Sequence, residues 1–390
     1  MVMQAKGVAT KTVYILGIRG IPGRHGGFET FAEHFALYMI DRGWKVFVYC
    51  QEDNVKTGML IREEEWRGVT KIVVPINRSG SFGSVEFDWR CSVDVKKRLG
   101  VVLILGYNTG IFAPLIRISH RRFAINMDGI EWMRGKWSLP IRAWFWVNEK
   151  IAAWAGTTLI ADHPEIANHL ARRAERSKIV TIPYGALSIC DAVVEPLNEF
   201  GVIPDKYLIS ICRIEPENLV LELVRAFSFK SRGYNFVVVG PTDPANRYHR
   251  AVRAASSSEV LFVGAIYDRV ALASLRWHAR AYCHGHTVGG TNPSLVEALG
   301  AGNAILAHDN KFNRWTAGDQ QFFFTDVASC GLRMDEISLN FGRVFQARRA
   351  ARARFEEAFQ LNKIHSAYEA ILEDIDAGIE VTKRFGEKYW

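Results

Sequence analysis

Short apolar runs rich in β-branched residues alternate with longer amphipathic stretches along most of this chain. Runs of about five such residues predict β-strands, and the amphipathic stretches between them predict helices. Strands that alternate with helices favour parallel sheets made of βαβ units, so we predict an α/β protein. The predicted strands begin at Val13, Lys45, Lys71, Val101, Arg122, Thr157, Lys178, Tyr207, Asn235, Val260, Arg280 and Ala304.

The alternation lapses once, in a segment with two prolines and no sustained period, and then restarts. Because 390 residues exceed what one hydrophobic core usually organises, we predict two Rossmann-like, doubly wound domains. A helical period from Phe355 predicts a helix that ends the second domain and packs back toward the first. The predicted parts are an N-terminal domain at 1–190, a linker at 191–206, a C-terminal domain at 207–370, and a C-terminal helix and tail at 371–390.

Open α/β sheets bind ligands outside the carboxyl ends of their strands. Two such domains that face each other therefore predict an active site in the cleft between them.

The cysteines indicate the cellular compartment in which the protein works, and the net charge limits its possible binding partners. The six cysteines are scattered without the spacing of a disulfide framework, which favours a reducing cytoplasm. The N-terminus lacks the apolar core of a signal peptide, and the most apolar run, from Val101, is interrupted by polar and turn residues. A net charge of +8 would attract nucleic acid, an anionic membrane or a charged small substrate, and does not choose among them.

The first predicted strand runs into a glycine-rich turn, GIRGIPGRHGGFET, that opens a predicted helix. Glycines let backbone N–H groups approach an anion, and the helix adds the positive end of its dipole. Gly26 and Gly27 are therefore candidate donor-binding residues. The alternative is a turn whose glycines serve close packing alone.

The segment HGHTVGGTNPSLVEALGAGNAIL, from His284, carries most of the chemical information in the second half. Gly289 and Gly290 break a strand, Asn292 can cap a helix that starts at Pro293, and Glu297 lies one turn inside that helix. This pattern presents free amides to a diphosphate and a carboxylate to sugar hydroxyls. A helix cap alone explains Asn292 and Pro293 equally well, but it does not need the paired glycines and Glu297.

Asp128 and Glu131 follow another predicted strand, in MDGIEWMRGKW. Two carboxylates at a strand exit suit acceptor orientation or removal of a proton from an attacking hydroxyl. The alternative is that Asp128 caps a turn and Glu131 pairs with Arg134. We expect no metal site, because Asp374 and Asp376 fall on the C-terminal helix, where we expect them to be solvated. His284 and His286 alternate on a predicted strand, but no third ligand lies nearby in the sequence.

Five tryptophans (Trp132, Trp137, Trp144, Trp146 and Trp154) are interleaved with basic residues in one short region. This mixture suits a membrane interface that carries a lipid-linked acceptor. A helix that buries its tryptophans in the core fits as well. The basic run RVFQARRAARAR, at Arg343, is similarly ambiguous, since such runs are usually solvated faces.

The segment from His284 resembles the nucleotide-sugar signature of retaining glycosyltransferases of the GT-B fold. That signature places two glutamates eight positions apart, followed by a helix of small residues. Glu297 matches the second glutamate, and Gly289 stands where the first is expected. The resemblance implies that backbone amides of Gly289, Gly290 and Thr291, or His286, take over the missing contact.

Four motifs in order, GIPGRHGGFET, DGIEWMRGKW, RIEPEN and HGHTVGGTNPSLVEAL, resemble bacterial β-1,4-rhamnosyltransferases of capsule and cell-wall polysaccharide synthesis. The resemblance implies two Rossmann-like domains facing across a cleft, dTDP-rhamnose as donor, a lipid-linked saccharide acceptor and no cofactor. It implies that Arg213 binds the donor diphosphate, and that Arg213, Asp128 and Glu131 are the catalytic residues. The expected location is the cytoplasm or the inner face of the plasma membrane, and no nucleic-acid partner is expected.

Three alternatives stay open. One is another GT-B enzyme, such as a hexosyltransferase that uses a UDP- or GDP-sugar, and another is an epimerase with the same fold. The third is a non-catalytic nucleic-acid-binding or regulatory protein on this scaffold, in which the glycine loops and Glu297 would have no task.

Overall fold

The computed structural model describes residues 11–23, 26–53, 55, 60–78, 80–119 and 122–379. Arg24 and His25 of the first glycine-rich turn lie outside the described residues. The chain divides into two compact units, which we describe separately. Unit 1 runs up to Ile182 and includes the residues from His365 on, and unit 2 is Pro183–Ile364.

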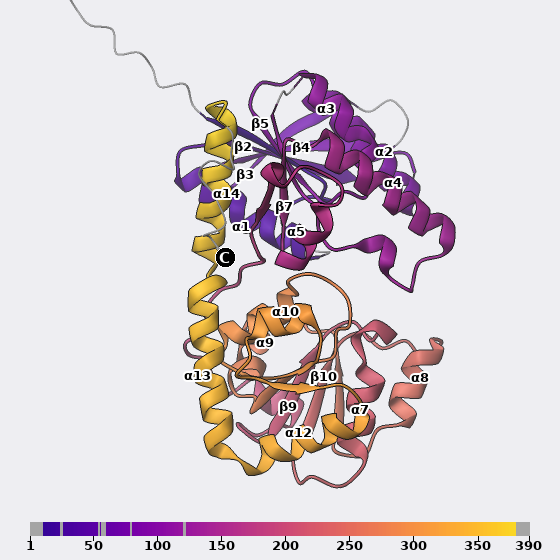
Figure 1. Ribbon diagram of the computed structural model, residues 1–390, viewed down its shortest axis with the longest axis vertical. Coiled ribbons are helices and arrows are strands. Elements are labelled where there is room, and N and C mark those ends of the chain that lie inside the picture. Colours follow the sequence, from indigo (N-terminus) through magenta and orange to yellow (C-terminus); the bar gives the residue numbers. More distant parts are fainter. Residues whose placement is uncertain are drawn as a thin grey trace, which may run out of the picture. The chain divides into compact units, whose positions relative to one another are not determined.

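Unit 1 is built on an eight-stranded sheet in the order β3-β4-β2-β1-β5-β6-β7-β8. Strand β3 runs antiparallel to β4, and the other described pairs are parallel. Helices cover both faces of this sheet (Figure 1). The strands are β1 (Thr12–Leu16), β2 (Lys45–Glu52), β3 (Arg62–Trp66), β4 (Val69–Pro75), β5 (Val101–Leu105), β6 (Ala124–Asn126), β7 (Thr158–Ala161) and β8 (Ile179–Thr181). The helices are α1 (Gly27–Asp41), α2 (Gly80–Val95), η1 (Gly110–Phe112), α3 (Ala113–Ser119), η2 (Glu131–Met133), α4 (Leu139–Ala155), α5 (Pro164–Leu170) and η3 (Arg176–Lys178), joined by α14 (Leu361–Asp376) from its fifth residue on.

Unit 2 has a six-stranded parallel sheet in the order β11-β10-β9-β12-β13-β14. Its strands are β9 (Tyr207–Ile211), β10 (Asn235–Val239), β11 (Val260–Gly264), β12 (Ala281–His284), β13 (Ala304–His308) and β14 (Phe322–Phe324). Its helices are α6 (Leu197–Phe200), η4 (Pro216–Asn218), α7 (Val220–Ser228), α8 (Arg247–Ala254), α9 (Arg269–Trp277), α10 (Pro293–Gly300), α11 (Lys311–Ala317), α12 (Val327–Leu339) and α13 (Phe341–Ala358). The predicted α/β class with two Rossmann-like units is confirmed.

All twelve predicted strands are present, but β3 and β14 were not predicted. The β3 sequence, Arg62–Trp66, is REEEW, and its charges hide the strand because it is an antiparallel edge with solvent on one side. The helix predicted from Phe355 is two helices, because α13 ends at Ala358 and α14 begins at Leu361.

The division between the units differs from the predicted boundaries. It falls after Ile182, and the predicted linker, 191–206, belongs to unit 2. Hydrogen bonds attach this segment to unit 2: the carbonyl oxygen of Ala192 accepts from His278, and that of Val193 accepts from Ser274. These bonds join residues more than 80 positions apart, so the sequence pattern does not reveal them.

The C-terminal helix α14 packs against α1 in unit 1, as the sequence predicted. The rings of His365 and Tyr368 contact Phe31 and Phe35, and the Tyr368 hydroxyl accepts a 2.6 Å hydrogen bond from Asn126. The expectation that Asp374 is solvated is wrong, because this side chain is buried. No helix in the described part of the chain is long and apolar enough to span a membrane.

The basic run in α13 is not a solvated face. Arg352 donates to the carbonyl oxygens of Gly300 and Ile189, and Arg348 donates to the carbonyl oxygen of Gly302. Several guanidinium groups therefore satisfy carbonyl groups near the end of α10 that the helix itself leaves free.

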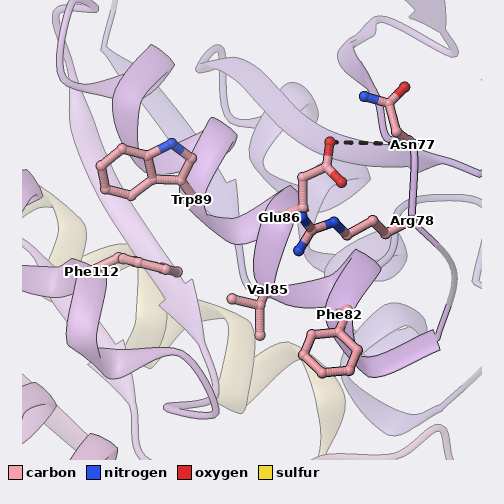
Figure 2. A pocket seen from close by; sticks show the side chains of 7 residues that line it. All are labelled: Asn77, Arg78, Phe82, Val85, Glu86, Trp89 and Phe112. Atoms are coloured by element: carbon pink, nitrogen blue, oxygen red, sulfur yellow. Dashed lines mark hydrogen bonds between the residues drawn. The ribbon is translucent and has the colours of Figure 1, made fainter. Parts of the chain in front are cut away.

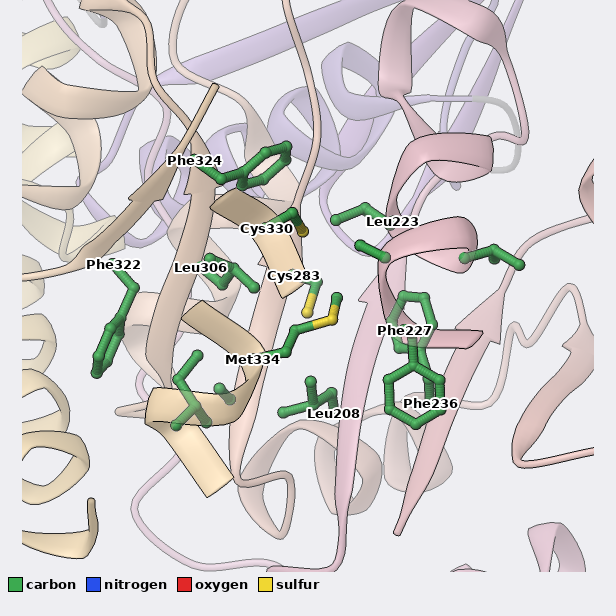
Figure 3. Packing of buried hydrophobic residues seen from close by; sticks show 14 of the residues in the cluster. Leu208, Leu223, Phe227, Phe236, Cys283, Leu306, Phe322, Phe324, Cys330 and Met334 are labelled. Carbon is green, nitrogen blue, oxygen red and sulfur yellow. The ribbon is translucent and has the colours of Figure 1, made fainter. Parts of the chain in front are cut away.

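The core of unit 2 lies between its sheet and α7 and α12. Phe227 of α7 packs against Phe236 of β10, and Met334 of α12 lies near Leu208 of β9 (Figure 3). These side chains are fully buried. Because such cores are packed to the density of organic crystals, a missing side chain leaves a cavity that the surroundings only partly fill.

We expect Phe236→Ala to lower the free energy of unfolding of unit 2 by about 3–5 kcal/mol. Urea unfolding followed by circular dichroism measures this loss. The matched control is Phe229→Ala, since Phe229 is 89% exposed and should change stability little. Equal effects of the two substitutions would contradict the described core.

Candidate functional site

The centre of the sheet in unit 2 is a topological switch point. The chain leaves β9 toward β10 on one side, and β12 continues toward β13 on the other. Ligands of open α/β sheets bind at the carboxyl ends of such strands. The two loops that leave this point touch, because Thr287 donates to the carbonyl oxygen of Glu217 from its amide and its hydroxyl, both at 3.0 Å. Gly285 lies so close to the Asn218 carbonyl that a Cβ would not fit.

Arg213 lies two residues after the end of β9, at this switch point. Its carbonyl oxygen accepts a 2.8 Å hydrogen bond from Asn218, which fixes the backbone. Its side chain is 64% exposed, and its ion pair with Glu215 is long, at 3.6 Å. The guanidinium is therefore held at the site but is accessible to an anionic ligand.

The N-terminus of α10 lies after the second loop. The Asn292 carboxamide oxygen accepts from the Ser294 amide at 3.1 Å and from its hydroxyl at 2.8 Å, so Asn292 is the helix cap that the sequence left as one alternative. Gly289 has φ 128°, which disfavours other residues, and no atom lies within contact of an added Cβ. Thr291 is buried and Gly290 lies between them. The donor-binding roles of Gly289, Gly290, Thr291 and Asn292 stay predictions.

Two stacked imidazoles stand at the end of β12. The rings of His284 and His286 are 4.2 Å apart and nearly parallel. Burial, together with the neighbouring His286, lowers the pKa of His284 well below its usual value, so this ring is neutral. Neither ring nitrogen of His284 has a hydrogen-bond partner among the described residues.

Glu297 of α10 forms an ion pair with the buried Arg276. The nearby Glu297 carboxylate also contributes to the raised pKa of Tyr184, whose largest cause is burial. Its predicted contact with the donor sugar stays a prediction. Removal of Glu297 would leave Arg276 buried without its partner, so Glu297→Ala should also lose stability.

The glycine-rich turn of unit 1 is less suited to an anion than the sequence suggested. Gly26 caps α1 without a side-chain hydrogen bond, and Gly27 begins the helix. The carboxylate of Glu33 already accepts from the Gly23 amide at 2.7 Å, and Glu29 lies in the first turn. These acidic groups lie near the positive end of α1 and would compete with a phosphate there, and the donor-binding roles of Gly26 and Gly27 stay predictions.

Unit 1 contains a cavity of about 960 Å³ at the carboxyl ends of β1 and β5. Its polar lining includes Asp88 and Glu131, and its aromatic lining includes Trp137 and Trp144. Carboxylates combined with aromatic faces suit a polyhydroxylated ligand, which offers hydroxyl donors and apolar C–H faces. A second pocket of about 450 Å³ lies beside it and shares residues Phe82, Val85 and Phe112 with it (Figure 2).

The structure brings Asp128 and Glu131 close together. Glu131 pairs with Arg134 at 2.8 Å, as the structural alternative expected, and it accepts from the Trp137 indole at 3.2 Å. Asp128 has φ 50°, and its amide donates to the side chain of Asn126. Burial and the neighbouring Glu131 raise the pKa of Asp128 to about 6. Glu131 lines the cavity, and Asp128 lies beside Glu131.

Asp88 of α2 was missed by the sequence analysis. It lines the cavity, and its carboxylate accepts a 2.7 Å hydrogen bond from the Thr109 hydroxyl. Burial raises the pKa of Asp88 to about 6, and no ion pair compensates it within the described ranges. The sequence did contain one signal for Asp88, its helical position one turn before the buried Ser92. A charged residue beside the buried stripe of a helix is a candidate functional residue, because burial of its charge is costly. No group of three metal-ligating side chains occurs among the residues that the structure describes.

We expect Asp88→Asn to stabilise unit 1 at neutral pH. The pKa of Asp88 in the folded protein, about 6, lies above the ordinary value, so its negative charge opposes folding above pH 6 and ceases to do so as pH falls below about 4. Asparagine removes this cost, with a gain on the order of 1–2 kcal/mol at pH 8 and none at pH 3. Urea unfolding at both pH values measures the difference. A loss of stability at pH 8 would mean that Asp88 is a structural group.

Comparisons with known proteins place this geometry in context. The sequence profile of a domain of unknown function (DUF1972) matches residues 10–187. No curated protein sequence matches the chain.

The chain is also similar to solved structures over nearly its whole length. Sucrose-phosphate synthase from Thermosynechococcus elongatus superposes with a TM-score of 0.79 at 14% identity, over 94% of this chain and 100% of the other. Anabaena HepE in complex with UDP and glucose gives 0.74 at 14% identity, over 93% and 99%. A UDP-forming trehalose-phosphate synthase from Burkholderia xenovorans, in complex with glucose-6-phosphate, gives 0.71 at 12% identity, over 93% and 100%. The chain therefore has the GT-B fold of glycosyltransferases.

Proposed function

We propose that this protein is a glycosyltransferase that moves a sugar from a nucleotide-activated donor to a saccharide acceptor. The observation that carries the proposal is the switch point of unit 2, where the exposed Arg213 and the loop before α10 lie at the carboxyl ends of β9 and β12. A departing nucleoside diphosphate gains negative charge, which a guanidinium and free amides at a helix N-terminus can stabilise. The similarity to structures named as sugar transferases or solved with UDP supports the same class.

The acceptor then belongs to the cavity of unit 1. Asp128 and Asp88 are carboxylates with raised pKa values beside or within that cavity, and Glu131 is oriented there by Arg134. A carboxylate with a pKa near neutral pH can orient a hydroxyl and share its proton. We assign Asp128 and Glu131 to positioning the acceptor hydroxyl.

The finer proposal names dTDP-rhamnose as donor and a lipid-linked glycan as acceptor, used at the inner face of the plasma membrane. It rests on the four motifs that resemble bacterial rhamnosyltransferases. The named neighbours point to UDP-sugars instead, so UDP-glucose is the alternative donor. We also propose retention of the anomeric configuration. The acceptor would attack from the leaving-group side, and a donor phosphate oxygen would take its proton.

Arg213→Ala should weaken donor binding about tenfold or more without loss of stability, because the exposed side chain contributes a charge-assisted hydrogen bond to phosphate and little packing. The measurement is the rise in melting temperature caused by dTDP-rhamnose, UDP-glucose and GDP-mannose, each added to the wild type and to the variant. The nucleotide sugar with the largest effect on the wild type identifies the donor class.

Arg343→Ala is the matched control, since Arg343 donates to main-chain carbonyl oxygens far from the switch point. It should leave every ligand-induced shift unchanged. If no nucleotide sugar raises the melting temperature of the wild type, the proposed function fails. If the Arg213 variant keeps the full shift, the position of the diphosphate is wrong.

Asp128→Asn should slow transfer strongly while donor affinity stays nearly unchanged, because Asp128 belongs to unit 1 and the proposed donor residues belong to unit 2. In the wild type we expect the rate to fall as pH drops below about 6, since the carboxylate becomes protonated there. Rates of sugar transfer across pH, with the product anomer read by NMR, test both expectations. An inverted product, or a sugar covalently trapped on Asp128 or Glu131, would exclude this mechanism.

A further inference from the structure

Helix α4 of unit 1 exposes an apolar face. Trp144 and Trp146 are each 38% exposed and Trp154 is 65% exposed. Leu139 and Val147 are exposed beside them. The helical period places Leu139, Ala143, Val147, Lys150 and Trp154 on one stripe, in which Lys150 is the sole charge. Large apolar groups therefore cover the side of the helix that usually carries polar residues.

Two polar residues of α4, Asn148 and Glu149, point inward. Glu149 is buried and accepts hydrogen bonds from the Trp132 indole and from Arg173, at 2.8 and 2.9 Å. Asn148 is also buried, and its side chain accepts from the Ile111 amide at 2.8 Å. These inward bonds fix the rotation of the helix, so the outward apolar face is a consequence of the native packing and cannot be relieved by turning the helix.

The exposed charge around this face is positive. Among the described residues of 111–156, the exposed charged side chains are Arg117, Lys136 and Lys150, and none of the acids Asp128, Glu131 and Glu149 is exposed. The Lys150 ammonium lies 3.8 Å from the centre of the Trp146 ring, so a cation and an indole share the surface.

The apolar surface continues onto the neighbouring elements. Ile118 of α3 is exposed, and α3 is tied to α4 through a hydrogen bond from Arg117 to the carbonyl oxygen of Ala155. Ile111 of η1 and Met133 of η2 are exposed as well. Figure 1 shows α4 and α3 on the same flank of unit 1. Exposed large apolar side chains on several neighbouring elements are typical of an interaction surface.

We propose that this α4 face, formed by Leu139, Val147, Trp146 and Trp154 together with Lys150, docks on a bilayer surface that contains anionic phospholipid. Indole rings favour the headgroup region, where their apolar body and N–H group are both satisfied, and lysine and arginine add attraction to anionic lipid. A protein partner would be expected to supply acidic groups in a shaped pocket, whereas the described face is convex helix with dispersed cations.

The position of the cavity agrees with this partner. Ile141 and Trp144 belong to α4 and also line the 960 Å³ cavity of unit 1. A docked α4 would therefore bring one wall of this cavity close to the membrane surface, where the saccharide of a lipid-linked molecule lies. The docking itself does not depend on the proposed transfer reaction.

Co-sedimentation of the full chain with vesicles tests the proposal. One set of vesicles contains phosphatidylcholine with phosphatidylglycerol, and the other contains phosphatidylcholine alone. We expect the wild type to bind the anionic vesicles, to be released by salt, and to bind the neutral vesicles weakly. The variant Val147→Glu with Trp154→Glu should bind the anionic vesicles about tenfold or more weakly, because carboxylates replace apolar groups in the contact.

The matched control is Phe229→Glu, a substitution of an even more exposed apolar residue in unit 2, and this variant should bind vesicles as the wild type does. Circular dichroism and melting temperature check that each variant is folded, and Trp154→Glu alone serves if the double variant is not. Unchanged binding of a folded α4 variant would overturn the proposal. So would a wild-type dimer in size-exclusion chromatography that these substitutions convert to a monomer, because a second copy would then cover the face.

Discussion

The hydrogen-bonded pairing of parallel strands around two central strands, β1 and β9, is the constraint on which the rest of the structure depends. A strand buried on both faces must be apolar and must satisfy its backbone polar groups through its neighbours. Connections to parallel neighbours must cross over through helices, so the carboxyl ends of the parallel strands meet on one edge of each sheet. The loops at that edge therefore carry the candidate functional residues. Arg213 and His286 follow strands of unit 2 there, and Asp128 follows a strand of unit 1.

Local pattern was enough to predict twelve of the described strands, because burial on both faces imposes a composition that can be read along the chain. It failed where the determinant lies far away in sequence. The strand at Arg62–Trp66 is defined by its antiparallel partner and not by apolar residues, since its glutamates form ion pairs with Arg62, Lys71 and Arg98. The unit boundary was missed because Ala192 and Val193 are attached to unit 2 by His278 and Ser274, which no local pattern indicates.

In the candidate sites too, the sequence revealed residues that local spacing brings together and missed those whose role depends on tertiary packing. Sequence spacing found Asp128 and Glu131, which lie close together, and it anticipated the pair between Glu131 and Arg134. It could not find Asp88, because the significance of that carboxylate comes from Thr109 and from the cavity, both formed by tertiary packing. Conversely, Glu297 matched a signature and is held in an ion pair with Arg276. A residue can satisfy a motif and also hold the fold together, so its substitution tests two roles at once.

Helix α4 illustrates why the tryptophan-rich region was ambiguous until the structure was known. Helical periodicity shows which residues share a face, but two faces of α4 are available for burial, one with Val147, Trp146 and Trp154 and one with Asn148 and Glu149. Apolar burial alone would favour the tryptophan face by several kcal/mol. The opposite face is buried because Glu149 meets Arg173, His169 and Trp132, and Asn148 meets Ile111. A buried carboxylate without these partners would cost more than the exposed indoles lose. The inward hydrogen-bond network therefore sets the orientation of the helix. The apolar surface that it leaves exposed to water remains available for contact with an apolar partner.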